Sequence, residues 1–267
     1  MRKKVIFLSV IVFMLSFLPA YISGVSAPDT ASAENTGLSV PPTRSENPAI
    51  PKDDPAGVSP RAVPIRNLWG AATGEKVDLA LHHSDNVVSW SWSRQHPIRR
   101  PGISYIQPIY PNARIVLKSP VAVSDIQSFN LVTDFKYTQQ PTGAYNLAYD
   151  VFLREPGVKV PKAEIMVWLD WTQAQPSRYL KGLCSDGYND YSKYWWTKAD
   201  GSTYHSFLLT LPTNTIPGPV NLKALIDYIQ PEKNWYISEV ELGTEVWDGS
   251  GAVELTTYYL ELNGARL

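Results

Sequence analysis

The stretch AEIMVWLDW, residues 163–171, places an acid at the head of an apolar run. In a β-strand successive side chains point to opposite faces, so alternation divides this stretch into an apolar face and a mixed face. The apolar face consists of Ile165, Val167, Leu169 and Trp171, and the mixed face of Glu164, Met166, Trp168 and Asp170. Acidic and aromatic groups together suit a sugar-binding cleft. An ordinary sheet face covered by a loop is the alternative.

A second alternating stretch, SEVELGTEVWDGSG at residues 238–251, carries three acids on one face. That face consists of Glu239, Glu241, Gly243 and Glu245, and the opposite face of Val240, Leu242, Thr244 and Val246. Like charges on one strand face repel each other unless they face water or take part in binding or catalysis. We expect at least one of Glu239 and Glu241 to be a solvated rim residue, and the DGSG after Trp247 to form a turn.

A third acid, Asp150, lies in YNLAYDVFL, residues 145–153, on a face with Asn146, Ala148 and Phe152. A buried charge without a partner is costly, so Asp150 needs a neighbour. A second carboxyl group could share a proton with it and tune the pKa of a catalytic group. A hydrogen bond to the backbone at a strand end is the alternative.

Two carboxyl groups that face each other across a cleft are what glycoside hydrolysis requires. One stays ionised and attacks the anomeric carbon, and the other holds a proton for the leaving oxygen. The two groups lie roughly 5–5.5 Å apart in a retaining enzyme and about 6.5–9.5 Å apart in an inverting one. Glu164 and Glu245, each on an alternating strand with aromatic neighbours, are the candidates for such a pair.

The elements that would position these acids are β-strands. Of the 267 residues, 44% are hydrophobic and 12% aromatic, with 9 Trp and 15 Tyr, and aromatic residues favour strands. Further strand-like segments, separated by turn residues, are residues 86–93, 113–118, 128–138 and 253–262. One helix is expected at residues 221–229, where apolar residues recur at helical spacing and Asn221 can cap the start. This pattern predicts an all-β sandwich or jelly roll with one helix.

The N-terminal residues 1–27 have the pattern of a secretory signal peptide: three basic residues, an apolar run and then small residues. An uncleaved membrane anchor is the alternative, although the apolar run is shorter than the roughly 20 residues that a span needs. Residues 28–61 are rich in Pro, Ser and Thr, which predicts a disordered linker. Residues 62–267 form the structured domain, and we expect a secreted, extracellular protein.

The charge and the cysteine content limit the kinds of partner and cofactor that we expect. The formal net charge of −1 gives no reason to expect nucleic acid or an acidic membrane surface as a partner. The single cysteine, Cys184, cannot form an internal disulfide, and we interpret it as a small buried hydrophobe rather than a nucleophile. The acids of residues 186–196 do not match the spacing of an EF-hand loop. We therefore expect no metal and no other cofactor, and a monomer free of the membrane after signal cleavage.

Four motifs together resemble glycoside hydrolase family 12, the small secreted endo-β-1,4-glucanases. They are RNLWGA (residues 66–71), NLAYDVFL (146–153), AEIMVWL (163–169) and GTEVWDGSG (243–251). They occur in the family's order and cover nearly the whole structured domain, and SWSWS followed by GISY also fits. The resemblance implies a β-jelly roll of two packed antiparallel sheets with one helix and a concave substrate cleft, and cleavage with retention of anomeric configuration.

The resemblance also implies roles for individual residues. Glu164 corresponds to the family's nucleophile and Glu245 to its general acid/base. Asp150 corresponds to the acid that hydrogen-bonds the nucleophile in the family. Trp69 corresponds to an aromatic platform on the non-reducing side of the cut. The full set of implied substrate-binding residues is Trp69, Asn67, Asn146, Met166 and Trp168.

The chain departs from the family pattern in three places. Arg66 stands where many relatives have Asn, so the resemblance does not extend to one polar substrate contact. Many relatives have an N-terminal disulfide that this chain cannot form. Residues 186–196 occupy the place of the family's cleft-crossing loop, where they could contribute to the product-side subsites or form a surface hairpin.

The implied activity is that of a secreted retaining endo-β-1,4-glucanase, a cellulase. It would cleave internal bonds of cellulose or related β-glucans by double displacement, through a glycosyl-enzyme ester on Glu164. Three alternatives stay open: a xyloglucan-specific endoglucanase, a noncatalytic carbohydrate-binding sandwich, and a structural or cell-surface β domain tethered by the N-terminal segment.

Overall fold

The computed structural model describes residues 58–59, 61–84, 87–174, 180–210 and 219–267. The predicted signal peptide at residues 1–27 and most of the predicted linker at residues 28–61 lie outside the described residues. Within these ranges no helix is long and apolar enough to cross a membrane.

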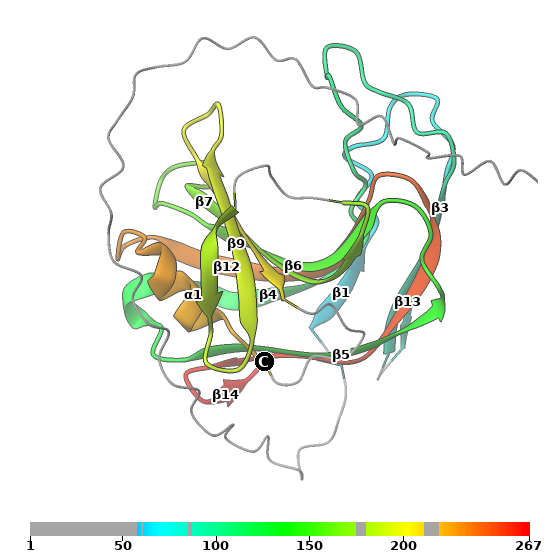
Figure 1. Cartoon of the computed structure of the whole chain (residues 1–267). Coiled ribbons are helices and arrows are strands. Elements are labelled where there is room, and N and C mark those ends of the chain that lie inside the picture. The colour runs from blue at the N-terminus through cyan, green and yellow to red at the C-terminus, as the bar shows by residue number, and fades with distance from the viewer. Residues whose placement is uncertain (1–57, 60, 85–86, 175–179, 211–218) are drawn as a thin grey trace, which may run out of the picture. The chain divides into compact units, whose positions relative to one another are not determined.

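The described residues form two packed β-sheets (Figure 1). In this part of the chain the larger sheet has eight strands in the order β1–β4–β12–β6–β7–β10–β9–β8. Its strands are β1 (Ala62–Ile65), β4 (Asn112–Ala122), β6 (Tyr145–Leu153), β7 (Ala163–Thr172), β8 (Leu180–Ser185), β9 (Asp190–Thr197), β10 (Thr203–Leu209) and β12 (Tyr236–Val246). In Figure 1 this sheet is strongly curved, and its hollow side faces away from the smaller sheet.

The smaller sheet has the order β11–β5–β13–β3–β2, and β14 pairs with β13. Its strands are β2 (Val77–Ser84), β3 (Val87–Arg94), β5 (Phe129–Gln139), β11 (Val220–Asn221), β13 (Gly249–Leu262) and β14 (Ala265–Arg266). A 3₁₀ turn, η1 (Val123–Asp125), follows β4. The four further strand segments predicted from sequence therefore correspond to β3, β4, β5 and β13, with ends that differ by one to several residues.

Neighbouring strands in the described ranges pair antiparallel, with one exception. β7 and β10 run parallel, from Ala163 opposite Thr203 to Trp168 opposite Leu208. The chain forms β8 and β9 between these two strands, so β10 can return to the edge of β7 in the same direction. The predicted antiparallel architecture is otherwise confirmed.

The core lies between the two sheets. Alternate side chains of β6, β7 and β12 enter it, among them Tyr149, Val167 and Leu242, each fully buried. Trp90 of β3 reaches across from the smaller sheet and its Nε1 donates to Thr244 Oγ1 at 3.0 Å. Because one face of each strand is committed to this core, the opposite face is left for the hollow side of the larger sheet.

The predicted faces of β7 are correct up to Leu169 and wrong beyond it. A bulge shifts the register, so that Trp168 lies opposite Ala148 but Asp170 lies opposite Leu147. The extra residue turns Asp170 toward the smaller sheet, where its Oδ2 accepts hydrogen bonds from Tyr137 at 2.7 Å and Tyr145 at 3.1 Å. Trp171, predicted on the core face, lies opposite Asn146, packs against both the main core and the second apolar cluster, and contacts the ring of Trp168.

The predicted helix is confirmed as α1 (Leu222–Ile229). Asn221 Oδ1 accepts a hydrogen bond from Ala224 N at 3.1 Å and caps the start. The helix ends at Gln230 in the left-handed conformation, with φ 57°, before Pro231. Its buried residues pack into the core, and α1 contacts β5.

Cys184 is 8% exposed and belongs to the core. Burial raises the pKa of its thiol to about 12, so the side chain acts as a small hydrophobe, as predicted. Residues 186–196 form the turn between β8 and β9 and most of β9 itself. Asp186 braces that turn, because its carboxylate accepts from the backbone of Tyr188 and Asn189 and from the Tyr191 hydroxyl. The hairpin interpretation of this segment is thus confirmed.

Candidate active site

A cavity of about 500 Å³ lies on the hollow face of the larger sheet, and we call it the acidic cavity. Its lining residues are Asn67, Trp69, Tyr110, Arg114, Asp150, Phe152, Arg154, Glu164, Met166, Glu239, Glu241 and Glu245. The strands β4, β6, β7 and β12 supply most of them, and the segment after β1 supplies Asn67 and Trp69. Six of the eight residues predicted for the site therefore lie around one cavity.

Glu164 stands at the start of β7, between Phe152 of β6 and Tyr204 of β10 in the register of the sheet. Its side chain is partly buried. The ammonium group of Lys198 forms an ion pair with Glu164 Oε2. This ion pair places a positive charge directly beside the Glu164 carboxyl group.

Glu245 lies near the end of β12, directly opposite Asn146 of β6. Asn146 Nδ2 donates to Glu245 Oε2 at 2.5 Å, and Glu245 N donates to Asn146 Oδ1 at 3.1 Å. Burial raises the pKa of Glu245 to about 8; the charge of Glu164 adds to the rise, whereas Asn146 and Lys198 oppose it. Asn146 itself is fully buried, so its predicted contact with substrate is replaced here by a contact with Glu245.

Asp150 is 7% exposed and lies between Met166 of β7 and Glu241 of β12. Burial raises the pKa of Asp150 well above its usual range, and the charges of Glu164 and Glu241 raise it further. Burial and these neighbouring charges favour the neutral form of Asp150 over its charged form. No hydrogen-bond partner of its Oδ1 is found among the described residues, which leaves this group able to serve a neighbouring carboxylate.

The two remaining acids of β12 are paired with arginines. Arg114 Nη2 contacts Glu241 Oε1 at 2.5 Å, and Glu239 lies 3.5 Å from both Arg114 and Arg154. Glu241 is 4% exposed, so it is not a solvated rim residue, and Glu239 is partly exposed. The sequence interpretation missed the arginines, although Arg114 alternates with core residues in ARIVLK and could have been assigned to this face.

Trp69 is held at the cavity with its ring open to solvent. It is 47% exposed, and its backbone is fixed by Asn67 Oδ1, which accepts from Trp69 N at 3.1 Å, and by Arg100, which donates to Trp69 O at 3.0 Å. An exposed ring on a fixed backbone suits stacking on a sugar. Asn67 thus contributes at least to the position of Trp69.

Met166 and Trp168 continue the hollow face of β7 but differ in exposure. Met166 lines the cavity and accepts a hydrogen bond from the Tyr204 hydroxyl at 2.9 Å. Trp168 is 1% exposed and packs in a second apolar cluster with Ala148, Tyr204 and Leu208. Trp168, predicted as a cleft residue, is therefore covered by neighbouring side chains on the hollow face and is not among the residues that line the cavity.

Lys198 is a further residue of the site that the sequence interpretation did not anticipate. It follows β9, at the start of the turn that leads to β10. The ADGS that comes next indicates a turn, but nothing in the local sequence indicates that this turn lies beside Glu164. The pairing of β10 with β7 brings the two together.

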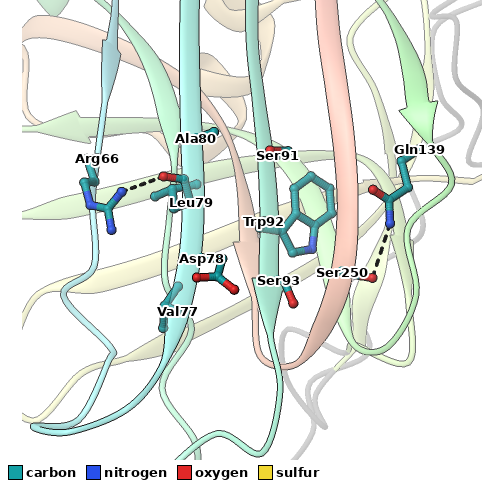
Figure 2. A pocket seen from close by; sticks show the side chains of 10 residues that line it. All are labelled: Arg66, Val77, Asp78, Leu79, Ala80, Ser91, Trp92, Ser93, Gln139 and Ser250. Carbon is teal, nitrogen blue, oxygen red and sulfur yellow. Dashed lines mark hydrogen bonds between the residues drawn. The ribbon is translucent and has the colours of Figure 1, made fainter.

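A second cavity, of about 600 Å³, lies against β2 and β3 of the smaller sheet (Figure 2). Among its described lining residues Asp78 is the single acid, so it lacks a carboxyl pair. Figure 2 shows Arg66 donating to the backbone oxygen of Leu79, with Nη1 and O 2.6 Å apart. Arg66 is thus engaged here and not at the acidic cavity, which remains the candidate active site.

Within the described ranges, no group of three or more His, Cys, Asp or Glu side chains is arranged to hold a metal ion. Three carboxyl groups of the acidic cavity, those of Glu164, Glu239 and Glu241, pair with basic groups. Glu245 pairs with an amide, and burial raises the pKa of Asp150. The chemistry that this arrangement supports is acid and nucleophile chemistry by two differently protonated carboxyl groups.

Comparison with known proteins gives one consistent family. A family model described as Glycosyl hydrolase family 12 matches residues 61–263. Endoglucanase S of Pectobacterium parmentieri is 23% identical over 213 residues, covering 74% of this chain and 80% of that protein. Probable xyloglucan-specific endo-beta-1,4-glucanase A of Aspergillus clavatus is 26% identical over 211 residues, covering 72% and 82%.

Solved structures show the same fold. The family 12 xyloglucanase from Bacillus licheniformis in complex with ligand has a TM-score of 0.62 at 25% identity, covering 74% of this chain and 91% of that one. Endoglucanase cel12A from Rhodothermus marinus has a TM-score of 0.60 at 21% identity, covering 78% and 93%. The predicted β-jelly roll is confirmed.

Proposed function

The chain belongs to glycosyl hydrolase family 12, and on that premise we propose that it is a secreted, retaining endo-β-1,4-glucanase. As a member of this family it is a glycoside hydrolase that acts on β-glucans. The retaining mechanism, the internal cleavage and the roles of single residues are part of the proposal.

The proposal rests on one observation: two carboxyl groups in the same cavity have different surroundings. Burial raises the pKa of Glu245 to about 8, so it holds a proton at neutral pH and can act as an acid. Glu164 is paired with the Lys198 ammonium, which suits a nucleophilic carboxylate. Surroundings that drive the protonation states of two carboxyl groups apart are typical of an acid and nucleophile pair.

The proposed reaction has two steps. In the first, a Glu164 oxygen attacks the anomeric carbon, the glycosidic C–O bond breaks, and Glu245 gives its proton to the leaving oxygen. In the second, Glu245 removes a proton from water, the water oxygen attacks the anomeric carbon, and the ester bond to Glu164 breaks. Asp150 is buried, and in its protonated form it would donate a hydrogen bond to the Glu164 carboxylate.

Two substrates fit the site, cellulose-type glucans and xyloglucan. The exposed ring of Trp69 at the cavity offers a stacking platform for a glucose unit of either backbone. The names of the Aspergillus and Bacillus relatives include xyloglucan, whereas the Pectobacterium relative is named an endoglucanase. A xyloglucan-specific enzyme is therefore the second candidate.

Activity of site variants tests the proposal. Glu164→Ala and Glu245→Ala are each expected to lower kcat on soluble β-glucans by roughly 10³-fold or more, because each removes a reacting group. The panel comprises carboxymethyl cellulose, mixed-linkage glucan and xyloglucan, assayed by reducing-end release. Glu155→Ala is the matched control, since Glu155 pairs with Lys162 away from the cavity, and it should keep parental activity.

Two outcomes would overturn the proposal. Near-parental kcat in either site variant would refute its assigned role. Binding of glucan by the parental protein without reducing-end release would favour a noncatalytic carbohydrate-binding sandwich.

Secretion is proposed from the pattern of residues 1–27. N-terminal sequencing of the protein recovered from culture medium should give a start close to residue 28. Recovery in the membrane fraction with an intact Met1 would indicate an anchor instead.

A further inference from the structure

Lys198 is fixed in place by the turn that it begins. Lys198 N donates to Ser202 O at 2.7 Å, and Gly201 N donates to Lys198 O at 3.0 Å. Asp200 Oδ1 accepts from the amide and the hydroxyl of Ser202, at 3.0 and 2.6 Å. These bonds hold the backbone between β9 and β10, so the Lys198 side chain starts from a defined point.

The side chain then runs to Glu164 over an aromatic ring. Its Nζ forms the ion pair with Glu164 Oε2 and lies 5.6 Å from the centroid of the Tyr204 ring. Tyr204 is buried, lies opposite Glu164 in the β7–β10 register, and is tied to Met166 through its hydroxyl. The ammonium group is therefore held both by a carboxylate and by the face of a ring.

The charges around Glu164 make this cation distinctive. The titratable groups that interact with it are Asp150 of β6, Glu245 of β12, Tyr204 of β10, and Lys198 in the turn after β9. Arg114 and Arg154 are occupied by Glu239 and Glu241. Within the described part of the chain, Lys198 is the basic residue that forms an ion pair with Glu164.

We infer that Lys198 is a positioning residue for the nucleophile, which holds Glu164 Oε2 so that the second oxygen, Oε1, is presented to the anomeric carbon. The inference rests on the proposed function of Glu164. Lys198 would not contact the reacting atoms; it would act through Glu164 by fixing the orientation of its carboxylate and by balancing its charge beside the other acids. Misplacement of a reacting group by about 1 Å can cost 100-fold in rate.

A second effect follows from the same charge. The Lys198 ammonium opposes the rise in the pKa of Glu245 that burial causes. Without it the pKa of Glu245 rises further, so the acid form persists to higher pH. Loss of Lys198 should therefore shift the basic limb of the pH profile, the decline in activity at high pH, to higher pH. Loss of a residue with a purely structural role in the turn would not cause this shift.

The test compares Lys198→Gln, which removes the charge, with Lys198→Arg, which keeps it. On soluble β-glucan, Lys198→Gln is expected to lower kcat by roughly 10- to 100-fold with little change in KM, and to move the basic limb upward. Lys198→Arg should retain more activity than Lys198→Gln, and the basic limb of its pH profile should match that of the parental enzyme. Lys223→Gln, which breaks an ion pair with Asp227 on α1, is the matched control and should leave both unchanged.

Chemical rescue separates charge from structure. Lys198→Cys can be alkylated with 2-bromoethylamine, which rebuilds an ammonium group at nearly the original length. The natural thiol, Cys184, is buried and burial raises its pKa to about 12, so alkylation should be selective. We expect the unalkylated variant to resemble Lys198→Gln, and the alkylated one to regain most of kcat and the parental basic limb.

The outcomes distinguish this inference from the proposed function. If Glu164→Ala is inactive but Lys198→Gln keeps parental kcat and the parental basic limb, the inference is wrong and the proposed function stands. Loss of activity that alkylation does not restore would also overturn it. If the parental protein cleaves no β-glucan, the proposed function itself fails. If Lys198→Gln lacks the near-UV spectrum of the native fold, Lys198→Arg and the alkylated Lys198→Cys variant provide the test of the inference instead.

Discussion

Glu164 and Glu245 are the same side chain in two surroundings. Glu164 receives an ammonium group, whereas Glu245 is buried and receives an amide from Asn146. An ammonium stabilises negative charge strongly; a neutral amide in a buried site does so weakly. Burial raises the pKa of Glu245 to about 8, and an ammonium group lies beside Glu164. The two carboxyl groups thus have the different surroundings that are typical of an acid and nucleophile pair.

Removal of the amide should change the pH profile in a defined direction. The hydrogen bond from Asn146 lowers the pKa of Glu245, which burial raises to about 8. In Asn146→Ala that bond is lost, the pKa of Glu245 rises further, and the acid form survives to higher pH. The basic limb of kcat/KM should therefore move upward.

Asn189→Ala provides the control for this change, because Asn189 is a buried amide that bonds Asp186 and Pro219 away from the cavity. Its basic limb should match that of the parental enzyme. A limb that stays fixed or moves downward in Asn146→Ala would show that Glu245 is not the group that titrates there.

The strands that carry the acids could be predicted largely from alternation. The period of two assigned the faces of β6 along its whole length and those of β12 from Glu239 to Val246, because one face of each is committed to the core. It failed in β7 at Leu169, since a bulge depends on pairing with β6 and has no local signal.

Local sequence patterns also could not predict contacts between segments that lie far apart in the sequence. Lys198 meets Glu164 because β10 pairs with β7, and Arg114 meets Glu241 because β4 pairs with β12. The motifs identified the acids that line the cavity, whereas sheet pairing determines which basic groups lie beside them.

The absence of a side chain at Gly243 of β12 allows close packing that helps to shape the acidic cavity. A Cβ at this position would lie 2.5 Å from Asn112 Cβ, 2.6 Å from Pro111 O and 2.7 Å from Tyr110 Cε2. Tyr110 lines the acidic cavity and donates to Ala148 O at 3.1 Å. The missing side chain thus lets Tyr110 lie close to the sheet between Glu241 and Glu245.

Gly243→Ala should displace Tyr110 and the start of β4. We expect a loss of about 1–3 kcal/mol in the free energy of unfolding, as for other overpacked sites, together with a raised KM. Gly264→Ala is the comparison, because Gly264 has a positive φ but no atom within 4 Å of the added carbon. It should cost some stability and leave KM unchanged. If Gly243→Ala keeps the KM of the parental enzyme, Tyr110 does not contribute to substrate binding.

The charge distribution of the folded chain has a consequence for its stability. The hollow face of the larger sheet gathers Asp150, Glu241 and Glu245, and burial raises the pKa of each. Elsewhere burial lowers the pKa of His205 to about 4. Above pH 7 His205 is mostly neutral in both the folded and the unfolded chain, so the buried acids dominate the pH dependence there.

The free energy of unfolding should therefore fall between pH 7 and pH 8. With a folded pKa above the unfolded one, Glu245 binds more protons in the folded state, and stability decreases as pH rises through this interval. Glu245 alone contributes a fall of about 1 kcal/mol. Urea denaturation at the two pH values measures the fall, and Glu245→Gln should reduce it. Stability that rises over this interval would contradict the assigned pKa shifts.

The order in which the product anomers form tests the proposed roles of Glu164 and Glu245 most directly. A β-glucan oligosaccharide is added to the enzyme, and proton NMR follows the anomeric signals before mutarotation mixes them. Attack by Glu164 followed by attack of water inverts the anomeric carbon twice, so the β-anomer should appear first. Initial release of the α-anomer would show single displacement by water, and Glu164 would not be the nucleophile.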